Sequence, residues 1–191
     1  MGNAKGSVLV GPIKFLRKRR EEARGVLAPE LHHYLEERVR LSSWYPETHF
    51  TALMLAAARL THEDLDRALE QMGAAGAHFH AEFYGDLLRS MGSNSSVFAL
   101  WSTQHDTGEL RTVADSPTAA HVELIGFDSP SRENCILCTG YIRGALAVNG
   151  FEVVAVEKTR CVIRGDDRCA WRVSWRNPDA TPVTPVRRRE R

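Results

Sequence analysis

NCILCTGYIRGALAVN, residues 134–149, is the stretch of sequence that decides the fold. It has the length of a helix, and Gly150 follows it in the position of a helix stop. Two strand-like segments come after it, at residues 151–156 and 169–175. We therefore predict one helix that leads into a terminal β-hairpin.

The sequence before that helix alternates between apolar and polar residues, which is typical of half-buried strands. Residues 109–114 and 121–125 show this pattern, and Ser116-Pro117 lies between them as a turn. These two segments fit an antiparallel strand pair. Together with the terminal hairpin they predict a curved antiparallel sheet that wraps around one central helix.

The first hundred residues have mostly helical periodicity. We predict, in order, a short strand at 7–10, a helix from Pro12 through the basic residues, a helix opening at Pro29, a packed corner at 43–46, a helix around 50–60, a helix pair over 65–88 and a short helix over 93–104. The predicted fold class is therefore α+β, with an N-terminal helical layer packed on the C-terminal sheet.

The composition is that of one globular domain. The chain has 191 residues, of which 43% are hydrophobic and 26% are charged. We place the domain at residues 1–176 and predict that residues 177–191, which are rich in proline and arginine and lack apolar periodicity, form a disordered tail.

The charge and the apolar runs argue against two classes of partner. The formal net charge of +1 gives no field that would favour nucleic acid or an anionic membrane surface. No apolar run approaches the roughly 20 residues that span a bilayer, and no secretory leader is visible. We therefore expect a cytoplasmic protein without a nucleic-acid or membrane partner.

All four cysteines lie in the last third of the chain, where they form the most distinctive pattern of the sequence. On a helix, Cys135 and Cys138 share one face, while Cys161 and Cys169 bracket a turn that brings them together. Four converging thiolates would suit tetrahedral Zn²⁺. Packing as small core residues and thiol redox sensing are the alternatives that the residues leave open.

The same region resembles a known group of domains. Cys135-x4-Gly140-Tyr141, followed by Cys161-x3-Gly165-x3-Cys169, is similar to the C-terminal signature of 4-vinyl-reductase-like small-molecule-binding domains. That superfamily includes TRAPP subunits, the sensor domains of aromatic-responsive activators and haem nitric-oxide-binding domains. Over residues 5–176 the chain also resembles a myxobacterial family of uncharacterised small cytosolic proteins. This resemblance is carried by residues 5–10, the Ser43-Trp44-Tyr45-Pro46 corner, Leu137-Cys138-x-Gly140-Tyr141 and the hairpin at 161–175.

The resemblance implies a metal site and a ligand pocket. The activators hold zinc with three cysteines and a glutamate, which implies Cys135, Cys161 and Cys169 as ligands here, with zinc as the candidate cofactor. Lys158 stands at the position of the glutamate, so Cys138 is the expected fourth ligand and Glu157 the alternative. The expected pocket residues are aromatic: Trp44, Tyr45, Phe79, Phe83, Phe98 and Trp101.

Haem is not expected from the sequence. The chain lacks the Tyr-x-Ser-x-Arg element that haem nitric-oxide-binding domains carry. Separately, His78 and His80 cannot share one helical face, so they do not form a metal motif. The sequence also lacks the common catalytic motifs, so we predict no enzyme activity. Gly140 and Gly144 permit a close approach to the central helix by a strand or by a second copy of the chain, which predicts a homodimer.

These observations predict a non-catalytic cytosolic module that senses a small apolar or amphipathic ligand and couples its binding to dimer or partner docking. A structural adaptor with a filled core and no ligand is the alternative.

Overall fold

The computed structural model describes residues 2–61, 63–90 and 100–176, with the side chains of residues 83–90 left out. None of the described helices is both long and apolar enough to cross a membrane. The predicted tail at 177–191 lies outside the described residues.

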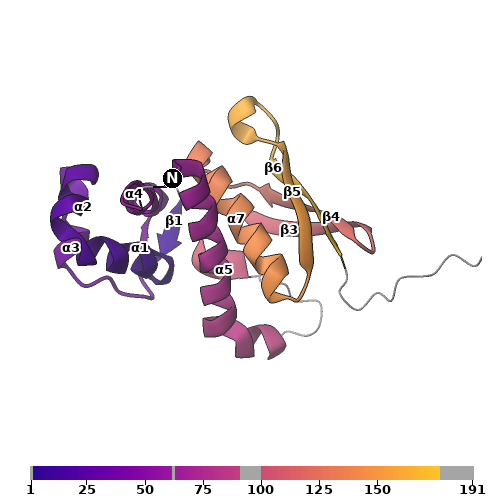
Figure 1. The fold of residues 1–191 in the computed structure, drawn as a ribbon, viewed down its shortest axis with the longest axis horizontal. Helices are drawn as coiled ribbons and strands as arrows, with labels where there is room; N and C mark the ends of the chain where they lie inside the picture. The colour runs from indigo at the N-terminus through magenta and orange to yellow at the C-terminus, as the bar shows by residue number, and fades with distance from the viewer. Residues whose placement is uncertain (1, 62, 91–99, 177–191) are drawn as a thin grey trace, which may run out of the picture.

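The N-terminal part is a small helical layer (Figure 1). Two short antiparallel strands, β1 (Asn3–Lys5) and β2 (Trp44–Pro46), join its ends. Its helices are α1 (Gly6–Lys18), α2 (Arg20–Val26), the 3₁₀ turn η1 (Pro29–Leu31), α3 (His33–Glu36) and α4 (Glu47–Arg59).

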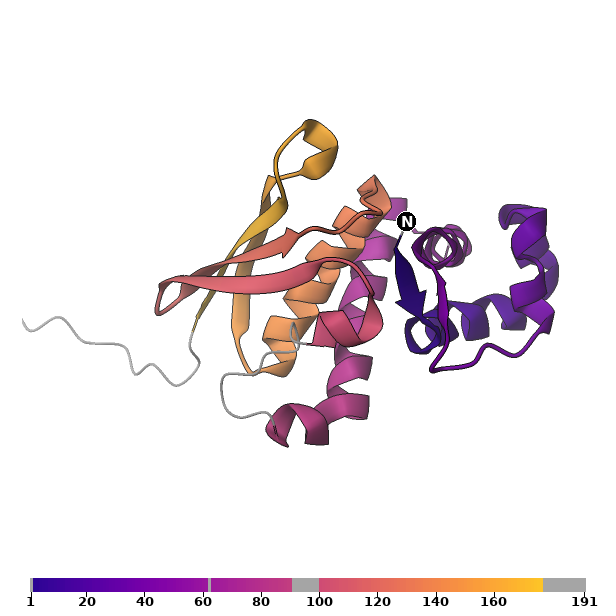
Figure 2. The same cartoon turned by 180° about the vertical axis from the view of Figure 1, so that it is seen from behind.

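The C-terminal part is built on an antiparallel sheet in the order β3-β4-β6-β5. Figures 1 and 2 show α7 lying between this sheet and α5, with the N-terminal helices beyond α5. The elements are α5 (Leu65–Ser90), α6 (Trp101–Gln104), β3 (Glu109–Ser116), β4 (Ala119–Ile125), α7 (Arg132–Val148), β5 (Glu152–Arg160), the 3₁₀ turn η3 (Val162–Arg164) and β6 (Cys169–Arg176). The predicted α+β class, with its curved sheet and central helix, is confirmed.

The central helix forms where the sequence predicts it. The Ser131 side chain accepts a hydrogen bond from the Asn134 amide at 3.1 Å and caps the first turn of α7. At the other end Gly150 has a φ of +83°, a conformation that favours glycine. The buried face of α7, which includes Ile142, packs against Trp171 and Val173 of the sheet.

The helix pair predicted over 65–88 is instead one helix, α5, capped by the Asp64 carboxylate at the Arg67 amide. Gly73 does not make a turn. A Cβ built on it would lie 2.1 Å from the Leu137 carbonyl oxygen, so glycine is needed there because α5 crosses α7 at close range.

Gly140 and Gly144 of α7 also allow the close approach of α5 and α7. A Cβ on Gly140 would lie 1.8 Å from the Glu70 carbonyl oxygen, and one on Gly144 would lie 2.6 Å from that of Ala74. The close approach predicted at these glycines is therefore made by α5 of the same chain, and the argument for a homodimer through them does not hold.

Residues 7–10 are not a strand but the first turns of α1, while β1 precedes them. Leu9, Ile13 and Leu16 recur at helical spacing and are all buried. Burial of this face outweighs the preference of Val8 and Val10 for a strand, and it keeps Pro12 inside the helix rather than in its first turn. The helix predicted at 93–104 is described only over α6, since residues 91–99 lie outside the described part.

Candidate functional site

A cavity of about 480 Å³ lies between the N-terminal helices and the α5–α7 pair. Most of its wall is apolar, as in typical sites for small molecules. The polar side chains that interrupt this wall are those of Ser7, Lys14, Glu47, His80, Gln104, His105, Asn134 and Tyr141. A filled core, which the adaptor alternative requires, is not what the structure shows.

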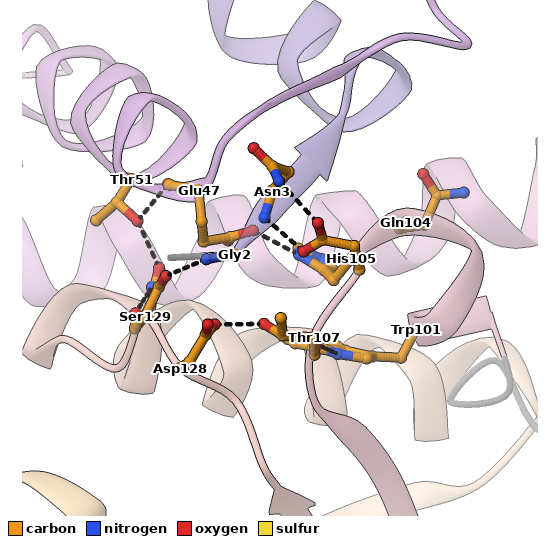
Figure 3. Close-up of polar contacts among 12 residues, drawn as sticks. Gly2, Asn3, Glu47, Thr51, Trp101, Gln104, His105, Thr107, Asp128 and Ser129 are labelled. Carbon is orange, nitrogen blue, oxygen red and sulfur yellow. Dashed lines mark hydrogen bonds and ion pairs between the residues drawn. The ribbon is translucent and has the colours of Figure 1, made fainter.

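His105 follows α6 directly and is 8% exposed. Its ring stacks on Trp101, with the centroids 4.0 Å apart and the planes 20° from parallel. Its Nδ1 lies 2.9 Å from Oε2 of Glu47, the first residue of α4, which is itself 1% exposed (Figure 3). The pair ties the N-terminal helices to the C-terminal part and fixes the imidazole ring in the wall.

The polar groups around this pair have partners within the protein. Ser7 donates a hydrogen bond to Oε1 of Gln104 at 2.6 Å, and Thr51 donates one to Oδ1 of Asn134 at 2.9 Å. Asn134 in turn donates to the Ser129 carbonyl at 3.0 Å. These bonds hold the wall in place, so that it is organised before any ligand enters.

His80 lies on α5, is 7% exposed and reaches the same cavity. Its Nδ1 is 3.0 Å from the Tyr141 hydroxyl, which α7 supplies. Burial, with a smaller effect from nearby His105, lowers the pKa of His80 from 6.5 to about 4. Burial also raises the pKa of Tyr141, which keeps its hydroxyl protonated. His80 is therefore a neutral imidazole at physiological pH.

The low pKa of His80 predicts an acid-sensitive fold. Below pH 6.5 the unfolded chain binds a proton on His80 that the folded protein takes up only near pH 4. The free energy of unfolding should therefore fall by about 3 kcal/mol as the pH drops from 6.5 to 4 because of this residue. Urea unfolding across this range should give a flatter profile for His80→Gln than for the unmutated protein. The exposed His78→Gln is the control, and an equally steep profile for His80→Gln would contradict the prediction.

Three of the four predicted metal ligands come together. The sulfur atoms of Cys135, Cys161 and Cys169 lie within 4.8 Å of one another, and the Cys135 and Cys161 sulfurs are 3.9 Å apart. Helix α7 supplies the first, the residue after β5 is the second and the start of β6 supplies the third. Cys138 is not in this group; it is buried and lines the cavity.

Lys158 lies beside the three thiols, with its ammonium 4.4 Å from the centre of the Trp171 ring. Burial opposes its charge, but the contacts with Cys135 and the other two thiols raise the pKa of Lys158 overall. The group next to the sulfurs is thus an ammonium, which has no lone pair for a metal. Glu157, the other alternative, is exposed on the opposite side of β5. The three thiols as metal ligands stay a prediction, and neither fourth ligand lies with them.

The predicted aromatic pocket is brought together only in part. Phe79 and Trp101 line the cavity. Trp44 is 44% exposed, with the Lys5 ammonium 5.1 Å from its ring centre, and Tyr45 packs on the N-terminal core. The side chain of Phe83 and the whole of Phe98 lie outside the described residues.

Comparison with solved structures places this architecture among known folds. A crystal structure of an H-NOX protein from S. oneidensis in the Fe(II)NO ligation state matches with a TM-score of 0.65 at 12% identity, over 91% of this chain and 99% of that chain. The chain has the H-NOX fold. A mutant of H-NOX from T. tengcongensis matches with a TM-score of 0.61 at 14% identity, over 92% and 99% of the two chains. A structure that probes haem distortion in the H-NOX family gives 0.60 at 14% identity, over 91% and 96%.

No protein-family profile and no curated protein matches the chain. The structural comparison nevertheless corrects three sequence-based expectations. The structures that share the fold are H-NOX domains rather than 4-vinyl-reductase-like domains, and they are described by haem and Fe(II). The expectation of zinc as the cofactor was therefore wrong, and so was the expectation that haem is not bound. The resemblance to the myxobacterial family stays a prediction.

Glu47, His80 and His105 were not predicted as site residues. No linear motif contains them, because they come from α4, from α5 and from the segment after α6. Only the contrast between His78 and His80 was visible, since residues two apart on a helix point to different sides. The structure agrees: His78 is exposed and His80 is buried.

Proposed function

We propose that this chain is a non-catalytic sensor domain that binds haem in the cavity between its N-terminal helices and the α5–α7 pair. The observation that carries the proposal is the buried His105, held by a carboxylate at one ring nitrogen. Histidines that bind metals almost always donate their other ring N–H to such a partner, which orients the ring and makes the ligand more basic. With Nδ1 directed at Glu47, Nε2 of His105 is the nitrogen for iron.

The cavity suits a flat, largely apolar ring with charged edges. Its wall is mostly apolar, and Phe127, Leu137 and Met72 are among the residues that would contact the ring faces. Lys14 lies at the exposed rim of the wall, where its ammonium can meet a carboxylate without being buried. The H-NOX fold supports the same assignment. When bound, haem supplies an iron centre at which a diatomic gas can bind.

The Glu47–His105 contact couples ligand binding at His105 to the position of the N-terminal helices. It is a buried link between α4 and the segment that follows α6, so a movement of His105 changes how the N-terminal helices sit on the C-terminal part. A sensor needs a ligand that favours one of two arrangements. We infer that the affinity for a partner protein, or for a second copy of the chain, depends on this change in arrangement.

Titration with haem tests the proposal. The reduced protein should bind one equivalent and show the visible spectrum of histidine-ligated iron. His105→Ala should weaken haem affinity by at least about 100-fold, because losing only the hydrogen-bond partner of a metal-binding histidine costs about 10- to 100-fold. His78→Ala, an exposed histidine, should bind like the unmutated protein. A chain that takes up no haem, or binds it equally well without His105, would refute the proposed function.

A further inference from the structure

Two buried imidazoles reach the one cavity from separate elements, His105 from the segment after α6 and His80 from α5. We propose that His80 is a second axial ligand, so that iron bound in this cavity is held between two histidines. The inference rests on the proposed function and goes beyond it, because it specifies the coordination of the iron and what an incoming gas must displace.

The state of His80 suits a metal ligand. Only a neutral imidazole offers a lone pair, and His80 is 7% exposed in a largely apolar cavity wall. The protonated form, which could not bind a metal, is disfavoured because its charge would be buried among apolar groups.

The orientation of His80 also suits this role. Its Nδ1 is 3.0 Å from the Tyr141 hydroxyl, and the two rings meet edge to face with centroids 5.6 Å apart. Tyr141 comes from α7, whose contact with α5 is fixed by the glycine crossing. This hydrogen bond sets the orientation of the His80 ring. In the tautomer in which Nδ1–H donates to the Tyr141 oxygen, Nε2 carries the lone pair that a metal needs.

The remaining explanation is a core histidine satisfied by tyrosine, with no function. The two explanations differ in what His80 does once haem is present. A structural histidine leaves iron with one protein ligand and an open position, whereas a second ligand fills that position. A gas can then bind only after His80 dissociates from the iron. Its apparent association rate constant is therefore reduced to the fraction of time that the position is open.

The experiment loads the full chain with haem and records the spin state by visible absorption and electron paramagnetic resonance. The unmutated protein should be six-coordinate and low-spin in both oxidation states. His80→Ala should still bind haem but lose the low-spin signal, and free imidazole should restore it by filling the vacated place. His78→Ala, two residues away on the same helix and exposed, should keep the low-spin signal.

Carbon monoxide gives a second readout on the reduced protein. Association should level off at high carbon monoxide in the unmutated protein, because departure of His80 becomes limiting. In His80→Ala it should rise linearly with concentration and be about 10- to 100-fold faster, which corresponds to an open fraction of about 1 to 10%.

The outcomes separate this inference from the proposed function. High-spin, five-coordinate iron in the unmutated protein would overturn the role of His80 and leave haem binding intact. A low-spin signal that survives His80→Ala would do the same. If the chain takes up no haem, the proposed function fails and the inference fails with it. Unfolding curves of His80→Ala show whether a lost signal comes from lost structure.

Discussion

Replacing Gly140 with alanine is expected to destabilise the protein by about 3 kcal/mol or more and to lower Tm by roughly 10 °C. The added Cβ would lie 1.8 Å from the carbonyl oxygen of Glu70 and 2.6 Å from its carbonyl carbon. Both atoms belong to the backbone of α5, so no side-chain rotation can relieve the overlap. The two helices would have to move apart, and the core beneath them would lose contacts.

The control for this prediction is Gly25→Ala, in the exposed last turn of α2. A Cβ there meets nothing within 4 Å, so alanine should leave stability unchanged or raise it by up to about 1 kcal/mol through its helix propensity. Urea unfolding followed by circular dichroism measures both variants. A Gly140→Ala protein as stable as Gly25→Ala would show that α5 and α7 do not cross as closely as described.

Removing the carboxylate of Glu47 is the second change with a large expected effect. Glu47→Ala leaves Nδ1 of His105 buried without its partner, which should cost about 2 to 3 kcal/mol of folding free energy. In the haem-loaded protein it should also lower affinity by about 10- to 100-fold, because the ring of His105 loses its orientation. Haem titration and chemical unfolding of the same variant measure the two effects.

Glu47→Gln separates the hydrogen bond from the charge. Its amide oxygen can still accept the bond from His105, so the stability loss should be smaller than that of Glu47→Ala. Glu82→Ala, at an exposed position of α5, serves as the matched control for removing an acid. If Glu47→Ala unfolds and binds haem like Glu82→Ala, the contact between Glu47 and His105 has no role in holding the site.

The parts of the fold that the sequence predicted are those that local rules decide. Helix α7 was predicted because its periodicity runs unbroken to Gly150, which ends it in the left-handed conformation. The strands β3 and β4 were predicted from their alternating apolar and polar residues. β4 alternates between buried and half-buried residues throughout, whereas Leu110 is the one buried residue of β3. Local sequence patterns of this kind predict the element correctly because tertiary contacts do not override them.

The errors occurred where distant segments meet. Residues 65–88 were predicted as a helix pair, although they form the single helix α5, in which Gly73 is needed for the crossing with α7. Residues 7–10 were predicted as a strand, although burial of Leu9 keeps them helical. Cys138 was grouped with the other cysteines by its spacing on α7, yet the turn of the helix directs it to the cavity.

The sequence by itself determined the α+β class, the central helix and its hairpin, and the convergence of three of its four cysteines. The class, the helix and the hairpin depend on residues close in sequence or on one repeating period, and the three cysteines come together because they lie on that helix and that hairpin. Only the tertiary structure decided where the cavity lies and that Glu47, His80 and His105 reach its wall. The reason is physical: these side chains are separated along the chain by tens of residues, and they meet only because the packing of α1, α4, α5 and α7 encloses one space.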